Sequence, residues 1–258
     1  MMQNRKFKKL TIFFMAVLQL ILLSACGSGS PGDSEEWDVL YPFQDQYNDL
    51  MGFKDADGNV VIEPQFISAG RFSEGLAFIR DVDGNDGFID TSGNVVISIP
   101  ATTSVVSGFS EGFARVIPRR WRSDEKQRLV GVYGPFIFID RTGENAFGME
   151  FGHAFSFEDG LALVTLLNGN QAFIDRTGKN AFEVEFKRAF HHIDGLAVVH
   201  LLNGNRAYIN RAGENAFGME FTSAFEFDRR GYAKVVLLDG TATYIDRDGN
   251  LHLDRIWG

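Results

Sequence analysis

One stretch of the chain, residues 81–87 (Asp-Val-Asp-Gly-Asn-Asp-Gly), spaces its carboxylates as a calcium-binding loop does. Three carboxylates this close can supply oxygen ligands to Ca²⁺. A twelve-residue calcium loop also needs glycine at its sixth position and glutamate at its twelfth, and this sequence has Asp86 and Ser92 there. The equivalent place elsewhere in the chain holds a plain Asn-Gly hairpin signal. We therefore interpret residues 81–87 as a turn and predict no metal site, a weak metal site being the alternative.

The other residues that could do chemistry also lack catalytic spacing. The five histidines show no metal-ligand pattern such as His-Glu-x-x-His. His192 takes the place that phenylalanine holds in other repeats, so we expect it to be a core residue. We find no Gly-x-Ser-x-Gly elbow or phosphate-binding loop. An acidic residue recurs once per repeat, whereas a catalytic group is normally unique, so we assign this residue to a turn. Its four clear copies are Glu74, Glu111, Asp159 and Asp194. We predict a protein that is not an enzyme and uses no cofactor.

One basic segment stands out in an acidic chain: an insertion near residues 118–132 that contains Arg119, Arg120, Trp121 and Arg122. Arginine and tryptophan dominate binding hot spots. Long loops carried by one repeat often give a repeat protein its specificity. These four residues are our candidates for contact with a protein or glycan partner. The alternative is a solvated hairpin extension without a partner.

The first 25 residues have the pattern of an export signal. Four basic residues within 5–9 precede an apolar stretch at 10–23, which is short for a membrane span. The stretch ends in Leu-Ser-Ala-Cys at residues 23–26, which resembles the bacterial lipobox. That resemblance implies cleavage after residue 25 and a lipid on Cys26, with an ordinary cleaved signal or an uncleaved anchor as alternatives. Cys26 is the only cysteine, so no internal disulfide can form.

This reading divides the chain into a signal at 1–25, a Gly/Ser-type tether at 26–36 and a folded domain at 37–258. Membrane contact would come through the lipid on Cys26, and the location would be the outer membrane if the organism has one. Loss of residues 1–25 removes four basic side chains and changes the side-chain charge from −9 to −13. A domain this acidic is poorly suited to binding nucleic acid, because proteins bind the phosphates mainly through Lys and Arg side chains.

The folded part is a series of tandem repeats. Each repeat has an aromatic-Ile-Asp-x-x-Gly segment, as in Phe173–Gly178, and an acidic-Gly-Leu-Ala segment, as in residues 159–162. The glycines that end the first segment are Gly58, Gly93, Gly143, Gly178, Gly213 and Gly249. Their separations are 35, 50, 35, 35 and 36 residues, so one repeat is about 35 residues long and one carries an insertion of 15.

Three strands fit each repeat. In one copy they are residues 172–175, 180–186 and 196–202. Between the first two, Asp and Gly suit a tight turn, and Asn203-Gly204 after the third predicts a hairpin into the next repeat. In 180–186, phenylalanine and valine alternate with glutamate, so we expect Val184 on the buried face. No helix pattern competes after residue 37, and we predict an all-β protein.

These segments resemble the WG-repeat family, also called KWG. Residues 52–77 fit best, including Val-Ile-Glu-Pro-Gln-Phe at 61–66, and the resemblance covers roughly residues 51–250. The family's Trp-Gly pair is incomplete here: Gly52 and Gly87 keep the glycine, while later repeats have Ala172, Ala207 and Thr243. The resemblance implies a repeat scaffold in the bacterial envelope and no activity. We therefore expect a non-enzymatic binding scaffold, the alternatives being an envelope hydrolase or metal-dependent enzyme and a structural spacer.

The two ends of the repeat series suggest how the array is completed. After five full repeats the chain ends with two strands of a sixth, and an orphan apolar stretch at 39–43 precedes the first repeat. An N-terminal strand that completes the C-terminal unit would close a ring and remove both exposed edges. A propeller-like closed ring is thus slightly preferred over an open curved β array with capped ends.

Overall fold

The computed structural model describes residues 40–123 and 129–253, and the regular structure there is all β. The strands form six antiparallel sheets, each built from one continuous stretch of chain. The fold class predicted from the sequence, an all-β array of small tandem repeats, is confirmed. No helix in residues 40–123 or 129–253 has the length and apolar character needed to cross a bilayer.

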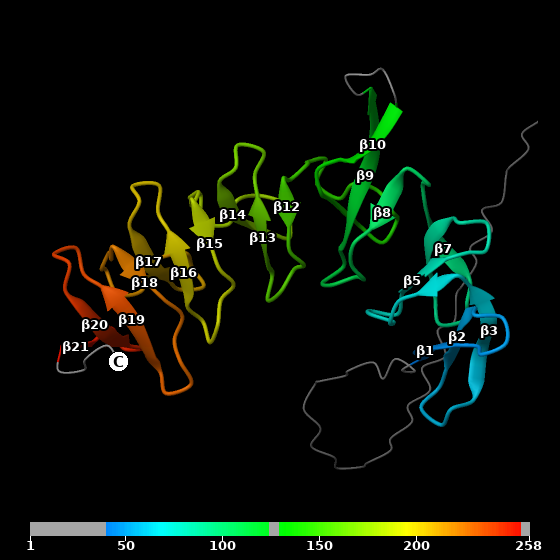
Figure 1. The fold of residues 1–258 in the computed structure, drawn as a ribbon, viewed down its shortest axis with the longest axis horizontal. Coiled ribbons are helices and arrows are strands. Elements are labelled where there is room, and N and C mark those ends of the chain that lie inside the picture. Colours follow the sequence, from blue (N-terminus) through cyan, green and yellow to red (C-terminus); the bar gives the residue numbers. More distant parts are fainter. Residues whose placement is uncertain (1–39, 124–128, 254–258) are drawn as a thin grey trace, which may run out of the picture. The chain divides into compact units, whose positions relative to one another are not determined.

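The six sheets follow one another in chain order (Figure 1). The first contains β1 (Tyr41–Gln44), β2 (Met51–Lys54) and β3 (Val60–Phe66), and the second β4 (Ser68–Ala69), β5 (Ala77–Arg80), β6 (Asp86–Ile89) and β7 (Val95–Ile99). The third contains β8 (Thr103–Val105), β9 (Ala114–Ser123), β10 (Leu129–Tyr133) and β11 (Ile137–Ile139), and the fourth β12 (His153–Ala154), β13 (Leu161–Thr165) and β14 (Gln171–Asp175). The fifth contains β15 (Arg188–Ala189), β16 (Ala197–His200) and β17 (Arg206–Ile209), and the sixth β18 (Ser223–Ala224), β19 (Tyr232–Val236), β20 (Ala242–Asp246) and β21 (Leu251–His252).

The hydrophobic core is divided into five clusters, each built from two successive sheets. Phe138 of the third sheet, for example, packs with Val164 and Ile174 of the fourth. The aromatic residue of the repeated motif lies at the centre of its cluster, and its side chain is almost wholly buried in Phe53, Phe88, Phe138, Phe173 and Tyr208. A phenylalanine of the motif thus fills the space between two sheets, and each sheet depends on its immediate neighbours for burial.

The strand predicted at 180–186 is wrong, although its counterparts β3 and β7 do form in the first two sheets. Residues 181–183 are a turn, flanked by single bridges at Asn180 and Phe186. The Asn180 side chain accepts a hydrogen bond from the backbone N–H of Phe182, and Glu183 has a positive φ. Asparagine turn chemistry thus overrides the alternation of the side chains. Val184, expected to be buried, is 45% exposed.

This difference explains why the family's glycine is kept only early in the chain. A Cβ at Gly52 would lie 2.6 Å from the carbonyl oxygen of Ile62, and one at Gly87 would lie 2.8 Å from that of Ile97. Both carbonyls belong to full-length third strands, β3 and β7. In the fourth and fifth sheets a turn replaces that strand, and Ala172 and Ala207 are accommodated with buried side chains. A close backbone approach therefore requires glycine only where the extra strand is full-length. In the sixth sheet the short β21 ends at His252 opposite Tyr244, and Thr243 is accommodated with a buried side chain.

The expected exchange of a strand between the two ends does not occur. β1 pairs with β2, its own neighbour in sequence, with Pro42 opposite Phe53. A tight turn stabilised by a hydrogen bond from Asp45 N to Leu50 O brings the two strands together. Such a short connection costs less entropy than closing a loop over the whole domain. The split sixth unit is therefore wrong, and none of the six sheets of the described residues closes into a ring.

Candidate functional site

The recurring acidic residue lies in a two-residue hairpin turn with unusual backbone geometry. Glu74 has φ 53° and Gly75 has φ 75°, and Ser73 and Leu76 exchange two backbone hydrogen bonds across the turn. Two central residues with positive φ are the pattern of a type I′ turn, which normally uses Asn-Gly. Glu111, Asp159 and Asp194 share this conformation, with φ between 50° and 52°. A left-handed conformation costs a non-glycine residue about 1–2 kcal/mol, so its recurrence calls for a compensating contact.

That contact is made with the next sheet. The Glu74 carboxylate accepts a hydrogen bond of 2.9 Å from the backbone N–H of Gly112, and Glu111 accepts one of 2.9 Å from Gly160. An arginine that follows the motif strand of the next sheet also reaches back to this turn. These contacts are Arg141 to Glu74, Arg176 to the Glu111 carbonyl, Arg211 to Asp159 and Arg247 to Asp194. The recurring acid lies in a turn, as predicted, and it also joins successive sheets, which the sequence did not predict.

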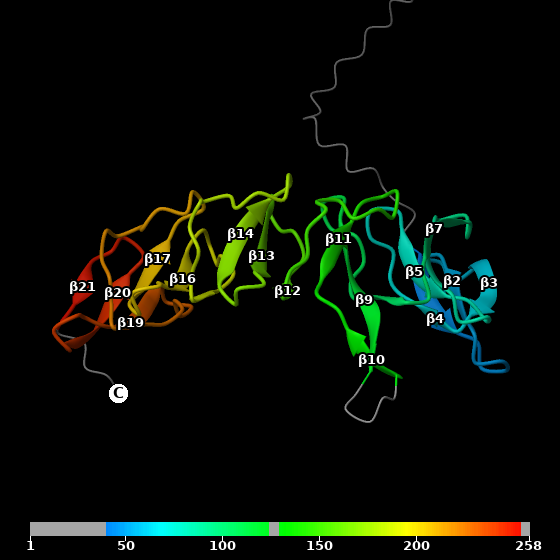
Figure 2. The ribbon, with the colours of Figure 1, turned by 90° about the horizontal axis from the view of Figure 1, so that it is seen from above.

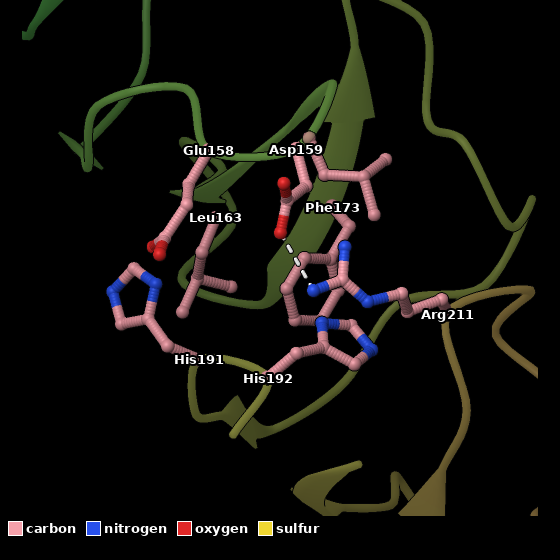
Figure 3. Close-up of a pocket in the computed structure, with 8 residues that line it drawn as sticks. Glu158, Asp159, Leu163, Phe173, His191, His192 and Arg211 are labelled. Carbon is pink, nitrogen blue, oxygen red and sulfur yellow. Dashed lines mark ion pairs between the residues drawn. The ribbon is translucent and has the colours of Figure 1, made fainter. Parts of the chain in front are cut away.

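One of these junctions has the composition of a catalytic centre (Figure 3). Asp159 pairs with Arg211 at 2.6 Å, and His192 lies beside them with its Nε2 3.1 Å from the carbonyl oxygen of Asn210. The cavity has a volume of only about 30 Å³. A single water needs at least about 10–15 Å³ by this measure, so the space suits water and excludes an organic substrate. Its charged groups hold the sheets together.

His192 fills an aromatic position, as the sequence predicted. It lies 5.1 Å from the ring of Phe173, and the corresponding distance between Phe88 and Phe109 is 4.9 Å. Burial lowers the pKa of His192, and the positive charge of Arg211 acts in the same direction. The ring is therefore a core residue that favours its neutral form.

The suspected calcium loop is a turn. Asp81 accepts hydrogen bonds from the backbone N–H groups of Asp83 and Asn85, at 3.0 and 2.7 Å. Asp86 binds the Arg80 guanidinium through both oxygens, at 2.6 and 2.8 Å. These carboxylates already have partners within the fold. Across residues 40–123 and 129–253, no three His, Cys, Asp or Glu side chains are grouped so that they could hold a metal ion.

A much larger groove lies between the fifth and sixth sheets, with a volume of about 480 Å³. This lies within the range of about 300–1,000 Å³ typical of ligand pockets. The residues that line it are Arg188, Phe190, Val198, His200, Arg206, Ala224, Phe225 and Glu226. We refer to it as the arginine groove.

Three of these residues form a row across the fifth sheet. Arg188 of β15 lies directly opposite His200 of β16, and His200 lies directly opposite Arg206 of β17. Figure 1 shows these three strands side by side. Residues opposite one another in a sheet point to the same face, with Cβ atoms about 4.5–5.5 Å apart. Two guanidinium groups and an imidazole are thus held together on the face toward the sixth sheet.

The second, fourth and sixth sheets do not carry such a row. The equivalent positions in the second sheet are Ser68, Arg80 and Asp86, where the arginine is neutralised by the aspartate. In the fourth sheet they are His153, Thr165 and Gln171, and in the sixth Ser223, Val236 and Ala242. The concentration of basic groups is therefore a property of one repeat and not of the repeat motif.

Each arginine of the row also contacts an aromatic ring. The Arg188 guanidinium lies 5.0 Å from the ring centre of Phe190, and that of Arg206 lies 5.8 Å from the ring centre of Phe225. Nη1 of Arg206 donates to Ser223 Oγ and to the carbonyl oxygen of Ala224, at 3.0 and 3.1 Å. These contacts restrict the guanidinium groups in the absence of any ligand.

The row is electrostatically unfavourable on its own. Burial lowers the pKa of His200, and the positive charges of Arg206 and Arg188 lower it further. Within the described part of the chain, neither Arg188 nor Arg206 forms an ion pair with a carboxylate, although Glu226 also lines the groove. A protonated His200 would lie opposite a positive charge on either side, and like charges placed opposite one another destabilise a sheet by up to about 1 kcal/mol, so the imidazole favours its neutral form. An anionic ligand would balance the positive charge of the two guanidinium groups.

The binding residues suggested by the basic insertion stay a prediction. The backbone of Arg119, Arg120, Trp121 and Arg122 lies in β9, which continues beyond β11 and pairs with β10 (Figure 2). The side chains of these four residues lie outside the described part of the structure, and so does Cys26 with the whole segment before residue 40. The pairing of β9 with β10 makes this insertion a hairpin.

Sequence reasoning missed the arginine groove because its basic residues lie outside the repeated motifs. Arg188, His200 and Arg206 are separated by 12 and 6 residues, which follows no motif spacing. The predicted hairpin did not give the pairing of His200 with Arg206 either. A two-residue turn at Asn203-Gly204 would place His200 opposite Ala207, whereas the structure has a hydrogen bond from Leu201 N to Asn205 O and places His200 opposite Arg206.

Comparison with known proteins supports the repeat assignment. Residues 51–85, 138–170 and 207–240 match a family described as WG containing repeat. No curated protein matches the chain. Among solved structures, the chain is similar to BamB from Moraxella catarrhalis (TM-score 0.30, 13% identity, 81% of this chain and 82% of that chain). It is also similar to the WD40 β-propeller domain of Doa1 (TM-score 0.26, 14% identity, 81% and 74%). Similarities this low carry no inference about function.

Proposed function

This chain is a WG-repeat protein, and we propose that it acts as a lipid-anchored, non-enzymatic binding scaffold of the bacterial envelope. The observation that carries the binding part is the row of Arg188, His200 and Arg206, which sits over a groove of about 480 Å³. In this proposal the other repeats serve as the frame that positions the fifth sheet. Five shared cores and a chain of acid–arginine contacts between sheets support that role.

The anchoring part of the proposal rests on the sequence that ends in Cys26. Acyl chains contribute about 0.8 kcal/mol per buried CH₂ group, so two or more chains on one cysteine hold a protein stably at a membrane. Metabolic labelling with a fatty acid and membrane fractionation, applied to the wild type and to Cys26→Ala, test this directly. We expect labelling and membrane retention to disappear in the variant. Unlabelled wild-type protein would refute lipidation.

The binding part can be tested by capture from solubilised envelopes with the full-length chain as bait. A double variant, Arg188→Gln with His200→Gln, removes basic groups from the groove and leaves the bonds of Arg206 to the sixth sheet in place. We expect it to lose a ligand that the wild type retains. Arg71→Gln, an exposed arginine outside the groove, is the matched control. Equal capture by the double variant and the wild type would exclude the groove.

The basic hairpin is a second candidate surface, and the structure allows it to be removed cleanly. Arg119 pairs with Tyr133, so replacement of residues 120–132 by Asn-Gly preserves the register and closes a two-residue turn. Deletion of 119–128 would instead leave β10 without its partner. If the hairpin binds a partner, the trimmed protein fails to capture it while capture through the groove persists. Unchanged capture would show that the hairpin is a solvated extension.

A further inference from the structure

We propose that the arginine groove binds an acidic sugar unit of a glycan through the oxyanion of that sugar. This inference rests on the binding function proposed above and specifies its ligand. The first argument is charge: two guanidinium groups flank an imidazole in a domain whose expected side-chain charge is −13 once residues 1–25 are removed from a chain of −9. A local reversal of charge selects anions and raises their rate of encounter.

The second argument is geometry. A guanidinium group has five N–H donors in a planar fork that matches the two oxygens of a carboxylate or phosphate. The two internal hydrogen bonds of Arg206 both come from Nη1. The donors on Nη2 and Nε are additional to these. Arg188 is exposed, and its guanidinium lies over the Phe190 ring. Within the described part of the chain its N–H groups donate no hydrogen bond, so they can serve a ligand.

The third argument is the apolar part of the groove. Phe190, Phe225 and Ala224 line it beside the basic row, and Phe225 is 48% exposed. A small inorganic anion would leave these surfaces uncovered. A sugar ring presents C–H groups that pack on the electron-rich face of a phenyl ring. The combination of an oxyanion with a ring that carries C–H groups describes an acidic sugar.

The oxyanion can be a carboxylate or a phosphate, and binding assays with three probes distinguish the two. Isothermal titration calorimetry at low ionic strength would use the full-length chain in detergent with trigalacturonate, its fully methyl-esterified form, and glucose 6-phosphate. The ester keeps the rings and loses the charge. We expect at least one anionic probe to bind and the ester not to bind. The stronger anionic probe identifies the type of oxyanion.

Variants test whether the binding occurs in the groove. Arg188→Gln is expected to lower the affinity for the probe that binds by at least tenfold, because each charge-assisted hydrogen bond contributes more than a neutral one. Arg71→Gln is expected to leave the affinity unchanged. Thermal unfolding curves of both variants check that the fold is intact. Equal affinity in Arg188→Gln and the wild type would overturn the proposal, as would binding of the ester as tight as that of the acid.

The test separates this inference from the function on which it rests. If neither anionic probe binds but the double variant in Arg188 and His200 still loses its captured envelope ligand, the acidic-sugar assignment is wrong and the binding scaffold stands. If capture is also unaffected, both fail.

Discussion

Oδ2 of Asp159, in the turn before β13, lies 2.6 Å from Nη2 of Arg211, which follows β17 in the neighbouring sheet. The same relationship joins Asp194 to Arg247 at 2.7 Å. In the earlier repeats a longer acid, glutamate, also reaches the backbone N–H of the next turn. The repeats therefore carry two versions of one junction. In one version the acid is hydrogen-bonded to the backbone, and in the other it forms only an exposed ion pair.

The two versions of the junction predict different effects of the same substitution. Glu111→Asn removes the carboxylate that accepts from Gly160 N–H, while the bond from Arg176 to the Glu111 carbonyl can persist. Hydrogen bonds to charged groups contribute about 1.5–3 kcal/mol, and relief of the left-handed strain offsets part of the loss. We expect the free energy of unfolding in urea to fall by about 1 kcal/mol.

Asp194→Asn is the matched control, because Asp194 has a similar positive φ and its carboxylate pairs, among the described residues, only with Arg247, in an exposed contact. Exposed ion pairs contribute about 0–1 kcal/mol, and asparagine tolerates positive φ better. We expect a change within about 0.5 kcal/mol of zero. Equal destabilisation by the two variants would show that the backbone hydrogen bond of Glu111 contributes nothing.

Two glycines with similar φ angles should differ strongly in how much stability is lost when each is replaced by alanine. Gly213 has φ 78°, and a Cβ there would overlap the Phe182 side chain, whereas Gly204 has φ 93° with nothing within 4 Å. Both variants incur the strain of a positive φ, about 1–2 kcal/mol. Gly213→Ala must in addition displace an aromatic ring between two sheets, which typically costs a further 1–3 kcal/mol or so. Urea unfolding of both should therefore separate them, and equal midpoints would contradict the packing.

The hydroxyl of Tyr208 makes a buried contact, and among the described residues Tyr244, its counterpart in the last repeat, has no hydrogen-bond partner for its hydroxyl. Tyr208 Oη donates a hydrogen bond of 2.6 Å to the carbonyl oxygen of Phe225. Tyr208→Phe leaves the ring in place, as in Phe173 of the previous sheet, and should lower the free energy of unfolding by about 0.5–1.5 kcal/mol. Tyr244→Phe, at the same motif position, should change it by less than about 0.5 kcal/mol. A larger loss of stability in Tyr244→Phe than in Tyr208→Phe would show that the hydroxyl contact of Tyr208 is not the stabilising one.

Three histidines predict how stability depends on pH. The pKa values of His153, His192 and His200 are lowered, in each case chiefly by burial. Positive neighbours add to the effect: Arg115 for His153, and Arg206 and Arg188 for His200. The unfolded chain therefore binds protons that the folded chain does not, so stability is complete above the ordinary histidine pKa of about 6.5 and falls as pH drops through it.

We expect the urea midpoint to be lower at pH 5 than at pH 7.5. Hydrogen bonds, of which the one with His252 contributes most, lower the pKa of Asp246 to about 2. Such carboxylates affect stability only at pH values below 5, so they do not account for a difference between pH 5 and pH 7.5. His192→Phe, which installs the aromatic residue of the other repeats, should reduce this pH dependence. A midpoint that rises toward pH 5 would contradict the burial of these rings.

The sequence predicted what each repeat needs locally. The turn glycines at the end of the motif do adopt positive φ, and His192 does take the place of phenylalanine. Both predictions rest on contacts that every repeat makes in the same way. Where two local preferences compete, the outcome could not be predicted: alternation favoured a strand through Val184, and the asparagine turn at Asn180 prevailed.

Relationships between distant parts were harder to predict. The pairing of residues 41–44 was decided by a short turn at Asp45 and not by the attraction of two unsatisfied edges. The groove needed the register of β15, β16 and β17 as well as the position of Phe225 on the next sheet. The position of Phe225 beside the basic row is a three-dimensional property that no spacing in the chain encodes.

The division of the core into five clusters has a consequence for the history of such chains. Because each sheet shares its buried surface only with the sheets before and after it, duplication or loss of one unit of about 35 residues recreates an interface of the same kind. A recognition site built from two adjacent sheets can then be inherited, moved along the array or lost while the remaining units stay folded. Relatives of very different length can therefore share a binding unit, and relatives of equal length can differ in what they bind.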